Sequence, residues 1–97
     1  MHRDETAAEI RHDVAARRFE SETGGHVAVL DYERADGEIA LTHTFVPPEL
    51  RGRGLAERLV RAALDFARRE KLRVNPVCSY VATFLQRHPE LAKPGEE

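Results

Sequence analysis

Two kinds of spacing between apolar residues divide this chain. In residues 38–46, large apolar residues alternate with small or polar ones, which is the period of a β-strand with two different faces. One face of this predicted strand would carry Ile39, Leu41, His43 and Phe45. In residues 55–70, apolar residues recur at the three- and four-residue spacing of an amphipathic helix. The pattern therefore predicts a domain that combines strands and helices.

Further strands are predicted before this region. Residues 26–34 are rich in β-formers, and the Asp36-Gly37 pair after them is a strong hairpin signal. Residues 10–22 alternate weakly and predict an earlier strand, which the Gly24-Gly25 turn would join to the next. Asp13 offers an alternative, because it could instead be the N-cap of a short helix. The glycine turn favours the strand.

The pattern after the long helix completes the predicted fold. Residues 72–75 predict a short strand, which Pro76 ends. A strand, a helix and a strand in this order predict a right-handed parallel crossover. Residues 78–88 fit a final helix with Cys78 or Ser79 at its cap. The expected fold is thus a mixed α/β sheet made of an antiparallel three-stranded meander, a β-α-β crossover and a C-terminal helix.

Length and composition narrow the class of protein. The 97 residues suffice for one domain with a modest core, expected at residues 10–92 between flexible segments at 1–9 and 93–97. The formal net charge of −2 and the lack of a basic block argue against nucleic acid as the partner. No run approaches the roughly 20 apolar residues of a membrane span. A single cysteine and a polar N-terminus predict a cytoplasmic protein.

Between the alternating strand and the amphipathic helix lies a loop with two glycines and two arginines, Arg51-Gly52-Arg53-Gly54, called the glycine loop below. Glycine adopts positive φ and lets the backbone approach a ligand closely. A helix start adds unpaired N–H groups and the positive end of the helix dipole. The loop therefore predicts a phosphate site. It is neither a dinucleotide fingerprint, because Glu57 stands where a small residue is needed, nor a Walker loop.

These residues also resemble a known family. The run Arg51-Gly52-Arg53-Gly54-Leu55-Ala56 matches the Q/R-x-x-G-x-G/A motif of the GNAT acyltransferase superfamily, at the strand-to-helix junction where that motif lies. Residues 42–47, Cys78 and the run Arg87-His88-Pro89 look like the compact, single-domain GNAT-like proteins. The similarity covers roughly residues 10–91.

The resemblance implies binding of acetyl-CoA. Backbone N–H groups of residues 51–56 would hold the pyrophosphate, and the pantetheine arm would run along the strand that ends at Phe45 and Val46. The thioester would lie where residues 72–75 splay away from that strand. Ser79 could be a helix cap instead of a ligand, and Tyr80 could belong to the core. The predicted cofactor contacts are Phe45, Val46, Arg51, Gly52, Arg53, Gly54, Leu55, Ala56, Ser79, Tyr80, Phe84 and Arg87.

Transfer of acetyl to an amine needs a base, a polarised thioester carbonyl and a departing thiolate. His43 has a suitable ordinary pKa for the base, and its alternative is a partly buried structural histidine. Cys78 could accept the acetyl group in a two-step route, line the pocket, or be a small buried hydrophobe. Tyr80 could protonate the thiolate, and a backbone N–H near Val46 could polarise the carbonyl.

One departure from the family pattern concerns the acceptor. GNAT enzymes carry two helices after their first strand, whereas here only the Gly24-Gly25 turn separates the corresponding strands. We expect an acetyl-CoA-dependent N-acetyltransferase that acts on a primary amine of a small molecule or protein. The alternative is a non-catalytic acyl-CoA-binding module that acts through a protein partner. The histidines show no metal-ligand spacing, so no metal is expected. A monomer and a weak homodimer both stay open.

Overall fold

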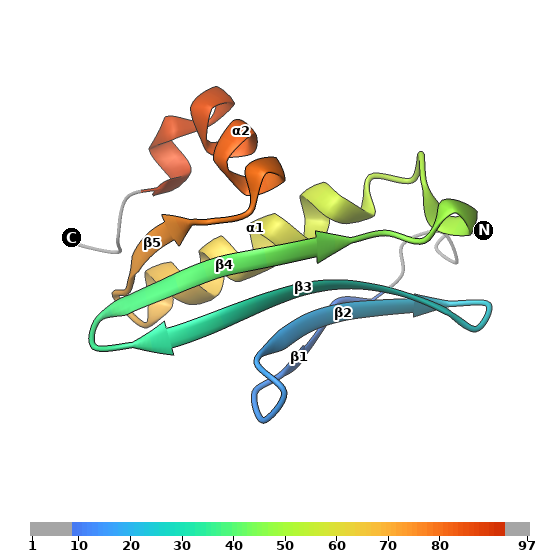
Figure 1. Cartoon of the computed structure of the whole chain (residues 1–97), viewed down its shortest axis with the longest axis horizontal. Coiled ribbons are helices and arrows are strands. Elements are labelled where there is room, and N and C mark those ends of the chain that lie inside the picture. Colours follow the sequence, from blue (N-terminus) through green and yellow to red (C-terminus); the bar gives the residue numbers. More distant parts are fainter. Residues whose placement is uncertain (1–8, 93–97) are drawn as a thin grey trace.

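Five strands form a single sheet in the order in which they occur along the chain. The computed structural model describes residues 9–92, so the segments predicted to be flexible, 1–9 and 93–97, lie outside the described residues except for Glu9. Strands β1 to β4 pair antiparallel, and β5 pairs parallel with β4 (Figure 1). The elements are β1 (Arg11–Asp13), β2 (Arg18–Thr23), β3 (His26–Ala35), β4 (Glu38–Phe45), η2 (Pro48–Leu50), α1 (Leu55–Arg69), β5 (Arg73–Pro76), α2 (Ser79–Arg87) and η3 (Pro89–Ala92). The predicted fold class is confirmed.

The strand predicted over residues 10–22 is divided in two by a turn at residues 14–17. Asp13 Oδ1 accepts a hydrogen bond from the Ala16 N–H at 3.0 Å, so Asp13 caps this turn and does not start a helix. Arg17 takes a positive φ of 58° at the end of the turn. Four antiparallel strands therefore precede the crossover, where the sequence pattern predicted three.

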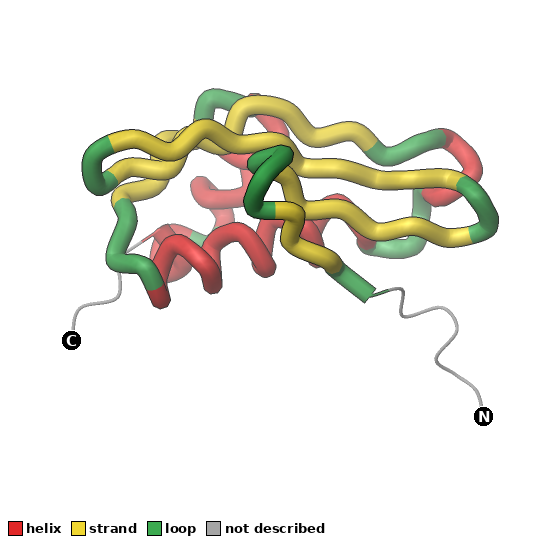
Figure 2. Tube along the Cα trace, turned by 90° about the horizontal axis from the view of Figure 1, so that it is seen from below, coloured by secondary structure: helices red, strands yellow, loops and turns green. Residues whose placement is uncertain are grey.

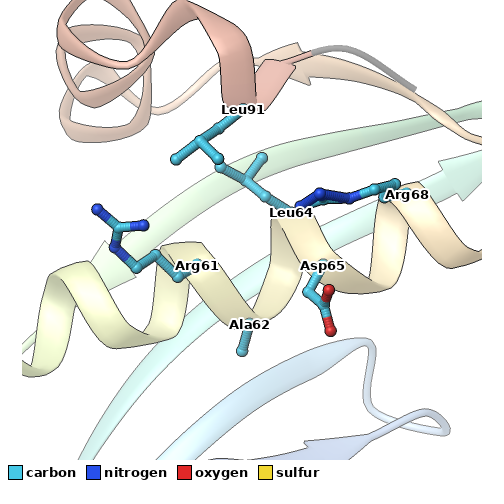
Figure 3. Close-up of a pocket in the computed structure, with 6 residues that line it drawn as sticks. All are labelled: Arg61, Ala62, Leu64, Asp65, Arg68 and Leu91. Carbon is cyan, nitrogen blue, oxygen red and sulfur yellow. The ribbon is translucent and has the colours of Figure 1, made fainter. Parts of the chain in front are cut away.

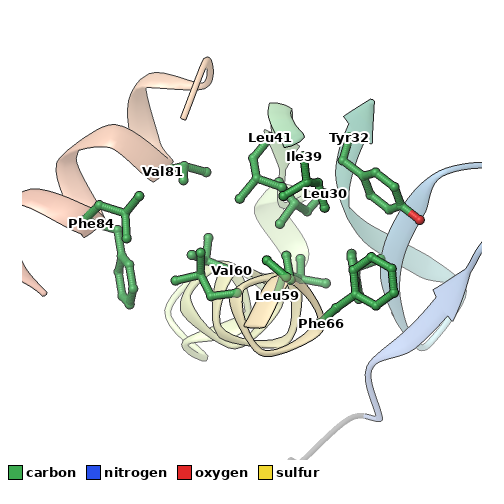
Figure 4. Close-up of a cluster of buried hydrophobic side chains, with 14 of the residues drawn as sticks. Leu30, Tyr32, Ile39, Leu41, Leu59, Val60, Phe66, Val81 and Phe84 are labelled. Carbon is green, nitrogen blue, oxygen red and sulfur yellow. The ribbon is translucent and has the colours of Figure 1, made fainter. Parts of the chain in front are cut away.

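The sheet and the helices form two layers. Figure 2 shows α1 beneath one face of the sheet, here called the inner face, and Figure 1 shows α2 beyond β5. In Figure 4, Leu30, Ile39 and Leu41 point from the sheet toward Leu59 and Val60 of α1. Each of these side chains is fully buried, and burying one such side chain stabilises the fold by about 1.5–3 kcal/mol. The opposite, outer face carries no helix within residues 9–92.

The β1 side of the inner face is closed by aromatic rings. The His12 ring stacks on Phe19 with centroids 4.1 Å apart, and Phe66 of α1 meets it edge-on at 4.6 Å. His12 Nε2 and the Tyr32 hydroxyl lie at the hydrogen-bonding distance of 2.7 Å. Ser21 is fully buried nearby on β2, and its hydroxyl has no hydrogen-bond partner among the described residues. A partly buried histidine and a fully buried serine thus lie in an otherwise apolar layer.

Strand β4 contains a β-bulge that changes which side chains face the core. Residues Asp31 and Tyr32 are adjacent on β3, yet they pair with His43 and Leu41 of β4, so Thr42 is an extra residue without an opposite partner. An extra residue reverses the alternation beyond it. The prediction that His43 and Phe45 share the face of Ile39 and Leu41 is therefore wrong: both lie exposed on the outer face.

Helix α1 has local reasons to begin and end where the sequence predicts. Glu57 lies in its first turn and arginines lie in its last, as the helix dipole favours. Glu57 and Asp65 each form an i,i+4 ion pair, with Arg61 and Arg69. Lys71, with a φ of 58°, turns the chain into β5. Within residues 9–92, no helix combines the length and apolar character needed to cross a membrane.

Candidate functional site

The pairing between β4 and β5 stops before β4 ends, and the unpaired stretch between them is called the gap below. Their parallel pairing runs from Glu38 and Arg73 to Leu41 and Pro76, and proline has no N–H to continue it. The last link is the Cys78 N–H, which donates to the Leu41 carbonyl at 2.8 Å. Strand β4 continues to Phe45 without a paired strand on that side in the described chain. The predicted splay of the two strands is thus present in the structure.

The glycine loop follows β4 after the turn η2. The Arg51 side chain folds back, and its Nε–H donates to the Val46 carbonyl at 3.1 Å. Gly52 and Gly54 have φ values of 82° and 75°, in the left-handed region that other residues rarely adopt. A Cβ added at either glycine would meet no described atom within 4 Å beyond its own chain neighbours. The two glycines therefore bend the chain into α1 and leave open space in front of the loop.

The start of α1 presents a row of unpaired backbone donors. The first hydrogen bond into the helix runs from the Arg58 N–H to the Gly54 carbonyl at 3.1 Å. In the described chain, the N–H groups from Gly52 to Glu57 find no backbone acceptor, and no side chain caps the helix. Such a row of donors, at the positive end of a helix dipole, favours a phosphate group.

A cavity of about 200 Å³ lies against these donors. Seven of its lining residues were predicted from the sequence: Val46, Arg51, Gly52, Gly54, Leu55, Ala56 and Tyr80. Leu50 and Glu57 also line it and were missed by the sequence reasoning. Leu50 could have been found as the apolar residue between Pro48 and the loop, and Glu57 by its place in the first turn. The cavity brings the loop and α2 together through Tyr80.

The remaining predicted cofactor residues do not line this cavity. Arg53 and Ser79 are exposed beside it, and Arg87 is exposed in the last turn of α2. Phe84 is buried, with the Arg61 guanidinium 5.4 Å from its ring centroid. Phe45 is exposed on the outer face because of the bulge.

Cys78 is the N-cap residue of α2 and faces the gap from the inner side. Its thiol lies 3.4 Å from Thr44 Oγ1 and donates a hydrogen bond to it. Burial raises the pKa of the Cys78 thiol, but the Thr44 hydroxyl and backbone N–H groups of the first turn can donate hydrogen bonds to the thiolate form, and their effect outweighs burial, so the pKa is lowered overall. The Cys78 side chain makes no capping hydrogen bond to the first turn of α2 in the structure. Burial, followed by the charge of Glu57, raises the pKa of Tyr80.

The two predicted catalytic residues lie on opposite sides of the sheet, His43 on β4 and Cys78 at the start of α2. His43 is exposed on the outer face and pairs across the strands with Asp31, whose carboxylate accepts a hydrogen bond from Arg18 Nε at 2.8 Å. Cys78 contacts Thr44, which pairs across the strands with the inner-face residue Leu30. The gap between β4 and β5 therefore has a histidine on one side and a thiol on the other. Among the described residues, no cluster suited to a metal ion occurs.

Comparison with known proteins decides the family. The family described as GCN5-related N-acetyl-transferase matches residues 18–93, which include the glycine loop, the gap and α2. The chain belongs to the GCN5-related N-acetyltransferase family. The resemblance to GNAT proteins inferred from the glycine loop is thereby confirmed, and members of this family generally use acetyl-CoA.

Relatives and a solved structure agree with this GNAT assignment. The chain is 41% identical over 83 residues to the protein named NATD1 from Bos taurus, across 82% of this chain and 74% of that one. It is 36% identical over 87 residues to NATD1 from Danio rerio, across 87% and 79%. The solution NMR structure of a GCN5-like protein from Staphylococcus aureus superposes with a TM-score of 0.70 at 26% identity, across 93% of this chain and 91% of that one.

Proposed function

We propose that this GNAT-family protein binds acetyl-CoA and transfers its acetyl group to a primary amine. The observation that carries the proposal is the row of unpaired N–H groups from Gly52 to Glu57, which lies against a cavity beside the free end of β4. A diphosphate placed there would accept hydrogen bonds from these groups without displacing any protein contact. The open space in front of both glycines supports the same fit.

The rest of the site supports a defined path for the cofactor. Acetyl-CoA supplies the acetyl group as a reactive thioester. From the glycine loop, the unpaired edge of β4 leads past Val46 and Thr44 to the point where β5 diverges. Backbone N–H groups along this edge are suited to orient an extended arm and to polarise a carbonyl. The inner side of the gap would thus hold the thioester, next to Cys78.

The acceptor would approach from the outer face, which no helix covers in the described chain. His43 is exposed there, so it could take a proton from an arriving ammonium group and leave a nucleophilic amine. The amine and the thioester would then meet in the gap from opposite sides. This arrangement favours direct transfer, and it fits both a small amine and the exposed amine of a protein.

A two-step variant uses Cys78. The Cys78 thiolate would attack the acetyl carbonyl and displace the CoA thiolate, which takes up the proton that Cys78 released. The amine would then displace the Cys78 sulfur from the acetyl group, and the released Cys78 thiolate would take up the proton that the amine loses. The lowered pKa of Cys78 and its contact with Thr44 support this variant.

A non-catalytic acyl-CoA-binding module is the second candidate. It is favoured by the bare outer face, because between β2 and β3 the chain has only the turn at Gly24 and Gly25 and builds no wall around an acceptor. In that case a protein partner would bind the domain at the gap when the ligand is present.

Calorimetric titration with acetyl-CoA tests the binding of this ligand, which both candidate functions require. Wild-type protein should release heat, and the Gly54→Glu variant, which places a carboxylate against the phosphate site, should not, although it stays folded by circular dichroism. Absence of heat with the wild type would overturn the proposal.

Thiol release from acetyl-CoA over a panel of amines separates enzyme from module. Turnover that His43→Ala lowers at neutral pH, and that returns toward wild type at high pH where the amine is already deprotonated, would support the base role. Intact-mass measurement after exposure to acetyl-CoA tests the two-step variant: an added acetyl group should be absent in Cys78→Ala.

A further inference from the structure

An apolar strip lies on the outer face of the sheet, at the end that borders the gap. Val27 and Val29 of β3 alternate with the buried Ala28 and Leu30, so their side chains point away from the core. Phe45 of β4 lies directly opposite Val29 across the strands. Val27 is 36% exposed and Phe45 is 45% exposed. No helix of the described chain covers this face (Figure 2), so Val27, Val29 and Phe45, called the outer strip below, are open to a ligand.

A carboxylate without a cationic partner lies at the far end of the outer strip. Glu22 of β2 pairs across the strands with Val27, and it alternates with the buried Ser21, which places its side chain on the outer face. The Glu22 side chain is exposed and forms no ion pair within residues 9–92. A cavity of about 280 Å³ lies at this corner of the sheet, and its lining residues are Glu9, Arg11, Glu22 and Gly24.

Ion pairs compensate the other acidic residues that β2 and β3 carry on this face. The arginines come from β1, from β2 and from the turn between them, and the pairs are Arg11 with Glu20, Arg18 with Asp31 and Arg17 with Glu33. Arg11 lines the corner cavity, but Glu20 compensates its charge. Glu22, with Glu9 in the same lining, therefore gives the corner a net negative charge. A positive group would find its complement there, at the end of an apolar path.

The strand pairing sets the distance between this corner and the gap. Neighbouring strands lie about 4.8 Å apart, so two spacings, about 10 Å, separate Phe45 on β4 from β2. Glu22 lies two residues further along, about 7 Å, because it pairs with Val27 and not with Val29. Glu22 and Phe45 are therefore about 12 Å apart on the diagonal across the face. The outer strip fills the space between them.

We infer that the acceptor is a linear diamine that lies along the outer strip, and that Glu22 binds its second ammonium group. The inference rests on the proposed function, because the first amine must enter the gap beside His43, which shares the outer face with Phe45. That nitrogen loses one proton to His43, forms a bond to the acetyl carbon as the bond to the CoA sulfur breaks, and gives a second proton to the departing thiolate. The methylene chain covers the outer strip, and the far ammonium group keeps its charge against the Glu22 carboxylate.

Rates of CoA release from acetyl-CoA with three matched amines test this inference. Extended diaminooctane holds its two nitrogens close to the required distance, octylamine has the same chain with a single amine, and diaminobutane is too short. Wild-type protein should show a kcat/KM about fivefold higher for diaminooctane than for octylamine, after allowance for the two reactive ends of the diamine, as expected for one exposed ion pair. Diaminobutane should be the poorest of the three. Glu22→Gln should bring the ratio of diaminooctane to octylamine close to one by raising KM for diaminooctane alone.

Asp36→Asn is the matched control. Asp36 is an exposed carboxylate in the turn between β3 and β4, at the opposite end of the sheet, and Asn-Gly suits the same turn. This variant removes the same charge as Glu22→Gln and should leave the ratio unchanged. If wild-type protein uses diaminooctane no better than octylamine or diaminobutane, or if Asp36→Asn lowers the ratio as much as Glu22→Gln does, the inference is wrong while the proposed function stands. If no amine is acetylated, the proposed transfer fails and the inference fails with it.

Discussion

Gly54 gives the sharpest test of what the glycine loop is for. It is the N-cap of α1 and has a φ of 75°, and Gly37 in the turn between β3 and β4 has nearly the same φ, 77°. A non-glycine residue in this left-handed region costs about 1–2 kcal/mol. Neither position would place a new Cβ within 4 Å of another atom. Gly54→Ala and Gly37→Ala should therefore lose similar amounts of folding free energy, for the same backbone reason.

The two variants should differ in ligand binding. Only Gly54 borders the cavity with the unpaired N–H groups, so a methyl group there would occupy the space that a diphosphate needs. We expect at least tenfold weaker acetyl-CoA binding for Gly54→Ala, about 1.4 kcal/mol, and wild-type binding for Gly37→Ala.

Thermal unfolding followed by circular dichroism measures the first effect, and calorimetry well below the melting transition measures the second. For a domain of this size, each kcal/mol should lower the melting temperature by about 4–8 °C. The reasoning is refuted if Gly54→Ala melts like Gly37→Ala and still binds acetyl-CoA like the wild type. Gly54 would then serve only to start the helix.

Three further predictions concern polar groups that are partly or fully buried. Burial and, after it, the charge of Arg69 lower the pKa of His12. As the pH falls, the unfolded chain therefore takes up a proton at this histidine before the folded chain does. Urea unfolding should show stability falling as pH drops below about 6.5, and His12→Gln should reduce that fall. Ser21→Ala should gain about 1 kcal/mol in the same assay, whereas a clear loss would mean that the hydroxyl has a partner. Thr44→Val should move the pH midpoint of iodoacetamide alkylation of Cys78 upward, and an unchanged midpoint would contradict the role of that hydrogen bond.

Most of the architecture was predictable because it follows from local signals. The apolar spacing of residues 55–70 gave the helix α1, and Asp36-Gly37 gave the turn between β3 and β4. The division of β1 from β2 was missed because its turn contains no glycine; its positive φ falls on Arg17. Sequence patterns mark turns by residue type, so a turn that uses an arginine there gives no warning.

The sequence predicted the glycine loop of the candidate site, but it predicted the surroundings of that loop less well. The glycines and the helix start indicated a site at this loop, and the structure has a cavity there that Tyr80 of α2 also lines. A cavity of about 370 Å³ between α1 and η3 (Figure 3) had no such signal, because its lining combines Leu91 of η3 with residues of α1 that lie far from it in the sequence. The placement of His43 could not be read from alternation, since an added residue in the backbone leaves the sequence pattern intact.

The bulge at Thr42 has a consequence for how this strand can change over time. The bulge reverses the alternation of the side chains along β4. The residues before it pack in the core and pair with β5, and the residues after it border the gap beside β5. Loss of one residue here would keep the composition nearly constant and yet exchange the sides on which His43 and Thr44 lie. In this strand, length is therefore under tighter constraint than residue identity, and substitutions should be tolerated where single deletions are not.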